Sequence, residues 1–157
     1  MAHGQGVPVG RQALALASVV LVAAGCQIGD SGDSDKEAFI QRADGICQRH
    51  AQRIGGIPPP QTFLRDFAVY LRRAVPIARQ QNAELEGLTP PDDVADDYRQ
   101  MLSLLSQQLD LAERAGEEAY AGREARAQAL YQQSLQPAGE GATVARKIGF
   151  TVCGNPR

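Results

Sequence analysis

The chain has 157 residues, of which 16 are Lys or Arg and 18 are Asp or Glu, so its formal net charge is −2. This balance argues against a nucleic-acid partner, because binding to a phosphate backbone requires a basic face. Aromatic residues make up only 5% of the chain and tryptophan is absent, so any core must be built mainly from Leu, Ile, Val and Ala.

Residues 1–25 have the pattern of a secretory signal rather than that of a folded segment. Arg11 is the only charged residue among them, and an uninterrupted run of apolar and small residues follows from Ala13 to Ala24. A basic region followed by an apolar region is typical of export signals. The run is shorter than the roughly 20 apolar residues that a membrane-spanning helix needs, which argues against a permanent transmembrane anchor.

The apolar run ends in Ala23-Ala24-Gly25-Cys26. This segment resembles the lipobox of bacterial lipoproteins, in which small residues precede an invariant cysteine, although Ala23 replaces the commonest residue, leucine. The resemblance implies that a diacylglyceryl group is attached to the thiol of Cys26 and that a peptidase cuts just before it. We therefore expect a lipid anchor at the extracytoplasmic face of the cell membrane. The alternative is an ordinary signal peptide, cut earlier in the run.

A short tether and a single domain are expected behind this cysteine. Residues 26–34 are rich in Gly, Ser and Asp and almost lack apolar side chains, a composition typical of a flexible linker. The remainder, residues 35–157, has the length of one domain. Removal of Arg11 with the signal leaves fifteen basic and eighteen acidic residues, a net charge near −3.

The first helix of the domain is predicted to begin at Ser34, because Ser34 and Glu37 have the spacing of a capping box. Behind this box, apolar residues and one histidine recur at spacings of three and four, which places them on one face of a helix. These residues are Phe39, Ala43, Ile46, Cys47, His50 and Ile54. Gly55 and Gly56 then end the helix, and three prolines at 58–60 form a stiff connection.

Three further amphipathic helices follow. They are predicted to run from about Thr62 to Glu86, from Asp92 to about Tyr120, and from near Arg123 toward the C-terminus. The apolar face of the last helix comprises Ala127, Leu130, Tyr131, Leu135, Val144, Ala145 and Ile148. No segment shows a sustained period of two flanked by hairpin turns. Four amphipathic helices with short connections predict an all-α, up-down four-helix bundle.

Prolines interrupt two of these helices. Pro76 is expected to kink the second helix, because proline lacks an amide donor and its ring clashes with the preceding turn. Pro137, Gly139 and Gly141 are expected to kink the last helix or to split it.

Two cysteines remain once Cys26 is assigned to lipid. Cys47 lies near the end of the first helix and Cys153 lies just past the last one. An even pair of cysteines in an oxidising compartment favours a disulfide, which would close a loop of roughly 105 residues and contribute about 4–5 kcal/mol by chain-entropy estimates. The alternative is two reduced thiols, one of them reactive.

Two short motifs carry a second resemblance. Phe39-x3-Ala43-Asp44-x2-Cys47 stands early in the domain, and Ile148-Gly149-Phe150-x2-Cys153-Gly154 stands at its end. Together they resemble a group of uncharacterised secreted or lipid-anchored helical proteins of actinobacterial type. The resemblance covers most of the mature chain, and it implies a helical bundle closed by a disulfide. It implies no activity.

Two groups of polar residues are candidates for a binding site. His50 would need partner ligands to hold a metal or haem, and the usual ligand spacings are absent, so a structural histidine is favoured. An acidic cluster, formed by Asp92, Asp93, Asp96 and Asp97, would suit calcium. It also suits the solvated start of a helix, where negative charge complements the helix dipole. We therefore predict no catalytic, cofactor-binding or metal-binding residue.

The other charged residues are interpreted as solvated surface. Around the turn before the last helix stand acidic and basic residues that can form ion pairs, namely Glu117, Glu118, Glu124, Arg114, Arg123 and Arg126. Exposed pairs of this kind contribute less than about 1 kcal/mol. The second helix is expected to carry a basic face that consists of Arg65, Arg72, Arg73 and Arg79.

Two hypotheses about function follow. The first is a non-enzymatic, lipid-anchored cell-envelope protein that acts as an interaction or assembly module, with an envelope protein of unknown identity as its partner. The second is a carrier of an apolar small ligand, held in a pocket between kinked helices at Pro76 or at the break from Pro137 to Gly141.

Overall fold

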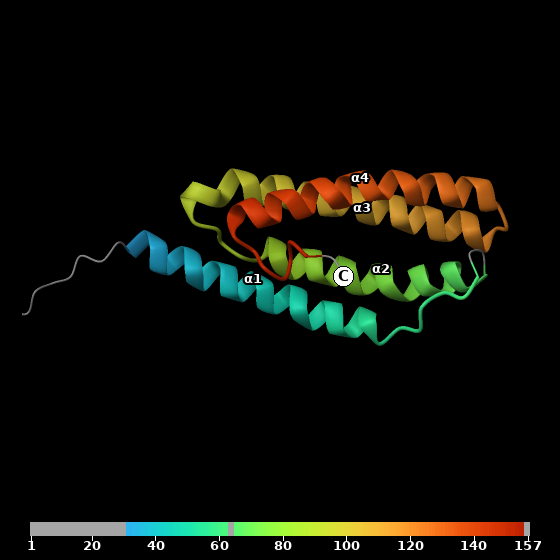
Figure 1. Cartoon of the computed structure of the whole chain (residues 1–157), viewed down its shortest axis with the longest axis horizontal. Helices are drawn as coiled ribbons and strands as arrows, with labels where there is room; N and C mark the ends of the chain where they lie inside the picture. Colours follow the sequence, from blue (N-terminus) through green and yellow to red (C-terminus); the bar gives the residue numbers. More distant parts are fainter. Residues whose placement is uncertain (1–30, 63–64, 156–157) are drawn as a thin grey trace, which may run out of the picture.

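The computed structural model describes residues 31–62 and 65–155. Figure 1 shows four long helices and one short 3-10 helix: α1 (Ser31–Gly55), α2 (Arg65–Glu86), η1 (Asp92–Val94), α3 (Ala95–Tyr120) and α4 (Glu124–Ile148). Each long helix packs against the next in the chain. The described residues contain no strand, so the predicted all-α, up-down bundle is confirmed.

The structure changes one predicted helix boundary and decides whether the last helix is split. α1 begins at Ser31, three residues before the capping box at Ser34, and Asp33 supplies negative charge to its first turn. α4 is one continuous helix across Pro137, so it is not split. It packs closely on α3 at this level, where Leu104 Cβ would lie 3.5 Å from a Cβ added at Gly141. The predicted signal, the lipobox (Ala23, Ala24, Gly25, Cys26) and most of the tether lie outside the described residues.

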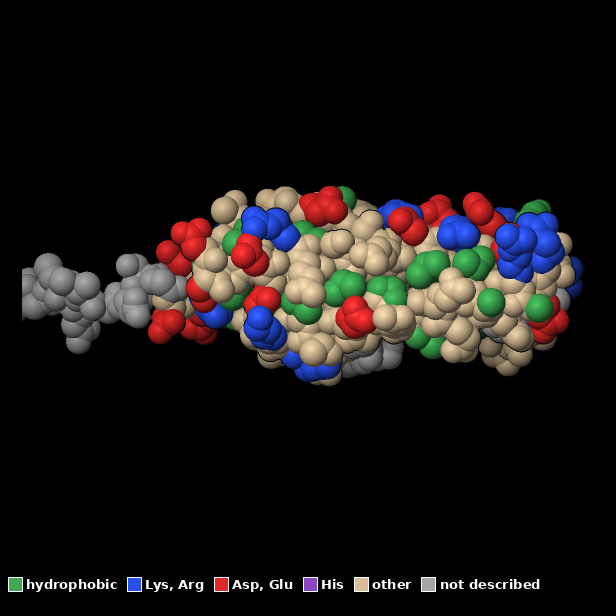
Figure 2. All heavy atoms as spheres, turned by 90° about the horizontal axis from the view of Figure 1, so that it is seen from above, with side chains coloured by type: hydrophobic (Ala, Val, Ile, Leu, Met, Phe, Trp, Pro, Cys, Tyr) green, Lys and Arg blue, Asp and Glu red, His purple; other side chains and the backbone are tan. Residues whose placement is uncertain are grey.

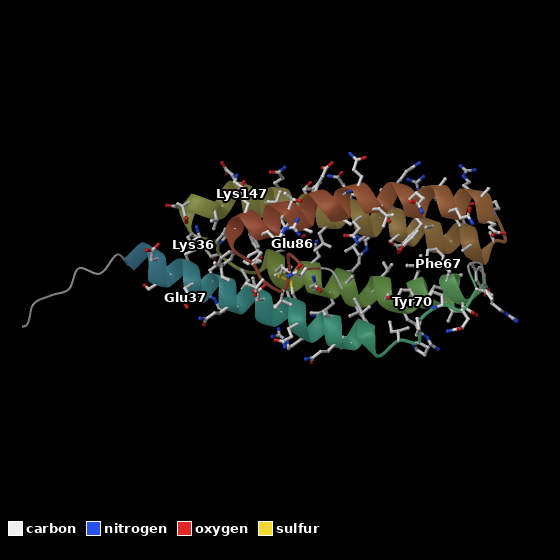
Figure 3. All side chains as sticks on the ribbon, viewed as in Figure 1. Lys36, Glu37, Phe67, Tyr70, Glu86 and Lys147 are labelled. Atoms are coloured by element: carbon white, nitrogen blue, oxygen red, sulfur yellow. A yellow bond between two sulfur atoms is a disulfide. The ribbon has the colours of Figure 1, made fainter. Side chains whose placement is uncertain are left out.

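The apolar core consists of two clusters because α1 is offset along the bundle. Arg53, near the end of α1, donates a 2.8 Å hydrogen bond to Gln80, so α1 ends beside the middle of α2. One cluster therefore joins α1 to the other helices, and the second joins only α2, α3 and α4. Figure 3 shows Lys36 at the end where α1 begins and Phe67 near the opposite end.

The first cluster is organised by three aromatic rings. Phe39 of α1 packs edge-on against Tyr98 of α3, with 4.9 Å between ring centroids, and its centroid lies 5.7 Å from that of Phe150. The hydroxyl of Tyr98 donates a 2.7 Å hydrogen bond to the Leu85 carbonyl, so this polar atom is satisfied inside the core. Edge-on aromatic pairs of this type stabilise a core beyond the area that they bury.

The predicted apolar face of α1 is confirmed from Phe39 to His50, all of whose members are buried. The predicted face of α4 is wrong at Leu135, which is 47% exposed. The neighbouring Ser134 takes the buried position, and its hydroxyl donates a 2.7 Å hydrogen bond to the Tyr131 carbonyl. A serine can occupy an apolar helix face when its own backbone satisfies the hydroxyl, and hydrophobic periodicity does not detect this.

The chain reverses sharply after α4. Gly149 has φ +110°, and the amides of Gly149 and Phe150 both donate to the Ala145 carbonyl at the helix end. Glycine is required here, because this φ disfavours side chains and an added Cβ would lie only 3.1 Å from Ile40 Cδ1. The reversal turns Phe150 into the core and directs residues 151–155 back toward α1.

A set of contacts that we call the C-terminal clasp fastens this tail to α1. The clasp comprises Asp44 and Cys47 of α1 together with residues 151–153. Cys47 and Cys153 form a disulfide across a sequence separation of 106 residues. The predicted pairing of these two cysteines is therefore confirmed.

Asp44 is the second part of the clasp, and sequence reasoning assigned it no role. Its carboxylate accepts hydrogen bonds from the Thr151 amide at 2.8 Å, the Thr151 hydroxyl at 2.7 Å, and the amides of Val152 and Cys153 at 3.0 Å each. Partial burial opposes ionisation, but these bonds outweigh it and hold the pKa of Asp44 below its usual value. The early and late sequence motifs thus meet in space through Asp44 and the disulfide.

Removal of the disulfide is expected to destabilise the protein strongly. Replacing both cysteines (Cys47→Ala with Cys153→Ala) should lower the free energy of unfolding by about 3–5 kcal/mol, because the long loop becomes unconstrained in the unfolded chain. Urea unfolding followed by circular dichroism measures this loss. The unchanged chain in excess reductant is the control and should unfold at a similar urea concentration. An unchanged midpoint in the variant would contradict the role of the clasp.

Asp44→Asn is expected to lower the free energy of unfolding at pH 7 by about 1–2 kcal/mol, because an amide accepts fewer of the four hydrogen bonds and the site is partly open to solvent. A carboxyl group whose pKa is lower in the folded state stabilises the fold at any pH above its unfolded-state pKa. This stabilisation is lost as the pH falls through the folded-state pKa. The gap between variant and unchanged chain should therefore shrink below about pH 4. Urea midpoints measured from pH 7 to pH 3 test this, and a gap that stays constant would count against it.

Candidate functional site

His50 forms part of the link between α1 and α2. The side chain is only 2% exposed, and its Nε2 lies 3.0 Å from Oε1 of Glu84. Arg53 Nη1 lies 3.4 Å from Nδ1, so both ring nitrogens have polar neighbours. The hydrogen bond with His50 is the main cause of a lowered pKa at Glu84. The interpretation as a structural histidine agrees with this geometry.

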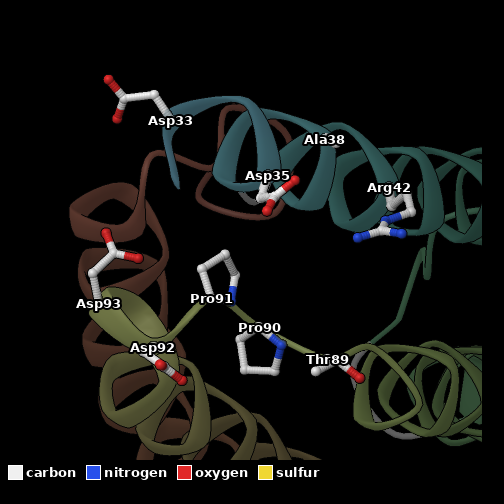
Figure 4. Close-up of a pocket in the computed structure, with 9 residues that line it drawn as sticks. All are labelled: Asp33, Asp35, Ala38, Arg42, Thr89, Pro90, Pro91, Asp92 and Asp93. Carbon is white, nitrogen blue, oxygen red and sulfur yellow. The ribbon is translucent and has the colours of Figure 1, made fainter. Parts of the chain in front are cut away.

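The acidic residues lie at the end of the bundle where α1 begins. Asp33 and Asp35 of α1, with Asp92 and Asp93 from the start of η1, border a hollow of about 720 Å³ (Figure 4). Figure 4 shows their carboxylates pointing in different directions rather than toward one point. Asp93 is paired with Lys36 at 2.8 Å. Among the described residues, no three His, Cys, Asp or Glu side chains are grouped so that they could hold a metal ion.

The opposite end of the molecule is richer in arginine. Figure 2 shows acidic side chains gathered where α1 begins and a group of basic side chains at the far end. Glu118 pairs there with Arg123 and, at 3.9 Å, with Arg126, as the sequence predicts. The hydrogen bond from Arg123 is the main cause of a lowered pKa at Glu118. Acidic side chains therefore gather at the end where α1 begins, while the far end carries arginines together with glutamates such as Glu118.

The predicted basic face of α2 is divided by its contacts. Arg79 pairs with Asp110 and Glu113 of α3, each at 2.7 Å, so it links two helices and is not a free basic residue. Arg72 lies over the ring of Tyr120, with 5.3 Å from its guanidinium carbon to the ring centroid. These partners lie far away in the sequence, which is why the local charge pattern of α2 did not indicate them.

An apolar groove between α2 and α3 is the feature most suited to binding. We call it the α2/α3 groove. It has a volume of about 300 Å³ and is lined by Leu71, Arg72, Val75, Pro76, Glu113, Gly116, Glu117 and Tyr120. The two helices approach closely at its floor, where a Cβ added at Gly116 would lie 3.2 Å from Leu71 Cβ. The groove belongs to the half of the bundle whose core α1 does not join.

The border of this groove exposes apolar surface. Tyr120, which lines the groove, is 73% exposed. Val69 lies outside the lining, one turn before Arg72 on α2, and is 44% exposed. Leu135 is the other large apolar residue among the described residues that is exposed to this degree. The aromatic ring of Tyr120 and the guanidinium of Arg72 are chemical groups that protein interfaces favour. The arrangement can therefore bind a partner surface.

Pro76 lines the groove, so one of the two predicted breaks does coincide with a concave site. The other does not border this groove, because no residue of α4 lines it, and Pro137 is buried within α4. Sequence reasoning placed no interaction surface at Tyr120 or Val69. Both residues lie off the predicted apolar faces of their helices. A large apolar residue at such a position is the sequence pattern that could have indicated an interaction surface.

Comparison with protein-family models, with curated proteins and with solved structures gives no match. None of the helices in the described part of the chain combines the length and the apolar character that a membrane crossing requires.

Proposed function

We propose that this chain is a lipid-anchored protein of the cell envelope whose helical domain acts as a non-enzymatic interaction module. The single observation that carries this proposal is the pairing of cysteines. Cys47 and Cys153 are joined in the domain, so Cys26, directly behind the apolar run, is the cysteine left for lipid. A structural disulfide also suits an oxidising extracytoplasmic compartment.

The layout of the domain supports the proposed anchorage. Residue 26 stands only a few positions before Ser31, where α1 begins, so the anchor would join the end of the bundle that carries the acidic hollow. The α2/α3 groove is lined by residues 71–76 of α2 and 113–120 of α3, and these segments lie toward the other end (Figure 1). A module attached in this way would present its apolar groove away from the membrane. The acidic end would face the membrane, and its negative charge would not draw the domain onto anionic headgroups.

The contacts that the polar side chains make within the fold support a non-enzymatic role. The two groups whose chemistry would be most useful for catalysis are already engaged in the fold, since His50 contacts Glu84 and Asp44 accepts four hydrogen bonds from the tail. General acid–base catalysis requires a group that is aimed at a substrate site. The groove is bordered by charged residues, but neither His50 nor Asp44 lines it.

A second candidate function is the carriage of a small apolar ligand. The observation in its favour is the α2/α3 groove at Pro76, whose volume of about 300 Å³ stands at the lower end of the range for ligand pockets. Its floor of Leu71, Val75 and Gly116 would suit an aliphatic or aromatic group. Its openness to solvent favours a flat partner surface over an enclosed ligand.

The anchor is tested by Cys26→Ala in a bacterial host that exports the chain. The unchanged chain should fractionate with membranes, carry the mass of its lipid and begin at residue 26. The variant should lose the lipid and the membrane association, because no thiol is left to acylate. Cys153→Ala is the matched control and should remain lipidated. An unchanged chain released without lipid and cut earlier in the apolar run would overturn the proposal.

Native mass spectrometry distinguishes the two candidate functions. The chain from residue 27 onward, secreted to an oxidising compartment, should have the mass of the disulfide form with no added small molecule. A reproducible added mass that disappears when Tyr120→Glu places a charge at the groove would instead support the carrier. Leu135→Glu is the control, because Leu135 is also an exposed apolar residue but does not line the groove.

A further inference from the structure

We propose that the α2/α3 groove is the interface of a parallel dimer, in which it packs against the same groove of a second copy of this chain. The proposal deepens the function proposed above by naming the partner, and its parallel geometry rests on the proposed anchor. Four features of the described residues support it: an exposed apolar border, two unpaired charges, their equal height along the bundle, and the place where the tether joins.

The groove is a surface that lacks a covering element within the described chain. α1 ends beside Gln80 of α2, about one turn beyond Pro76, so it does not extend along the level of Leu71 and Gly116. Tyr120 stands beside this floor with 73% of its surface exposed. Exposed apolar groups gathered at a concave site mark an interaction surface, whereas single exposed residues do not.

The charges at the groove make it complementary to the same groove of a second copy. Arg72 follows Leu71 on α2, and Glu117 follows Gly116 on α3. Because Leu71 and Gly116 meet across the floor, Arg72 and Glu117 lie at the same height. Neither forms an ion pair with another residue in the described ranges. A two-fold axis parallel to the helices would place Arg72 of each copy opposite Glu117 of the other.

The anchor favours this parallel symmetry over an antiparallel one. Both copies would be attached to the same membrane through residue 26, at the end where α1 begins. A two-fold axis parallel to the bundle brings the two tethers to the same side, whereas an axis perpendicular to the bundle would send them to opposite sides. In the parallel dimer, the ring of Tyr120 on one copy faces α2 of the other near Val69.

The experiment uses the full chain with two different epitope tags, expressed together in an exporting host and extracted in detergent. The unchanged copies should purify together. Arg72→Glu in both copies, or Glu117→Arg in both, should reduce the captured second copy by about tenfold or more, since like charges then oppose each other at two places. Co-expression of one R72E copy with one E117R copy should restore capture, because each repulsive pair becomes attractive again.

The matched control is Arg73→Glu, which makes the same charge change on the neighbouring residue, outside the groove lining. It should leave capture within about twofold of the unchanged chain if the effect is local to the groove. Restoration in the mixed pair also excludes misfolding as the cause of the losses. Failure of the mixed pair to recover, or equal loss with R73E, overturns the dimer.

A photo-reactive amino acid at position 120 identifies the occupant directly on intact cells. A product of twice the chain mass supports the dimer. A product with a different protein, or no capture of a second unchanged copy, overturns the dimer while the proposed interaction module stands. Loss of lipid on the unchanged chain would overturn the anchor instead, so the two failures are distinguishable.

Discussion

The structure depends on the attachment of the C-terminal tail to α1. α1 packs against α2 and, through Phe39, against Tyr98 of α3, while the tail links it to the end of α4. The Cys47–Cys153 bond makes this link covalent, and Asp44 satisfies three consecutive backbone amides of the tail. Phe150 is thereby held against Phe39 in the main cluster of the core.

The offset of α1 explains why one end of the bundle is more open than the other. The aromatic cluster, the clasp and the His50 contacts all lie where α1 overlaps the other helices. Beyond that overlap, α2, α3 and α4 form a core of their own, in which four alanines accompany larger residues such as Phe67 and Leu130. α1 does not join this core, and the α2/α3 groove lies on its surface between α2 and α3.

The distribution of charge agrees with a scaffold that binds at one end and is anchored at the other. Acidic side chains surround the start of α1, where a lipid anchor would attach, and the arginine-rich end carries the groove. The polar groups in the interior serve the fold, as the contact of His50 with Glu84 illustrates. An interaction module needs an exposed apolar surface, and Tyr120 at the α2/α3 groove provides one.

The sequence by itself determined the four helices, their order and most of their buried faces, because an amphipathic pattern depends on residues three and four positions apart. It also indicated the Cys47–Cys153 pair by elimination. Only the tertiary structure decided the offset of α1, the role of Asp44, the pairing of Arg79 across α2 and α3, and the groove beside Tyr120. The reason is physical: these features arise from side chains on different elements, and local periodicity does not specify how far one helix slides along another.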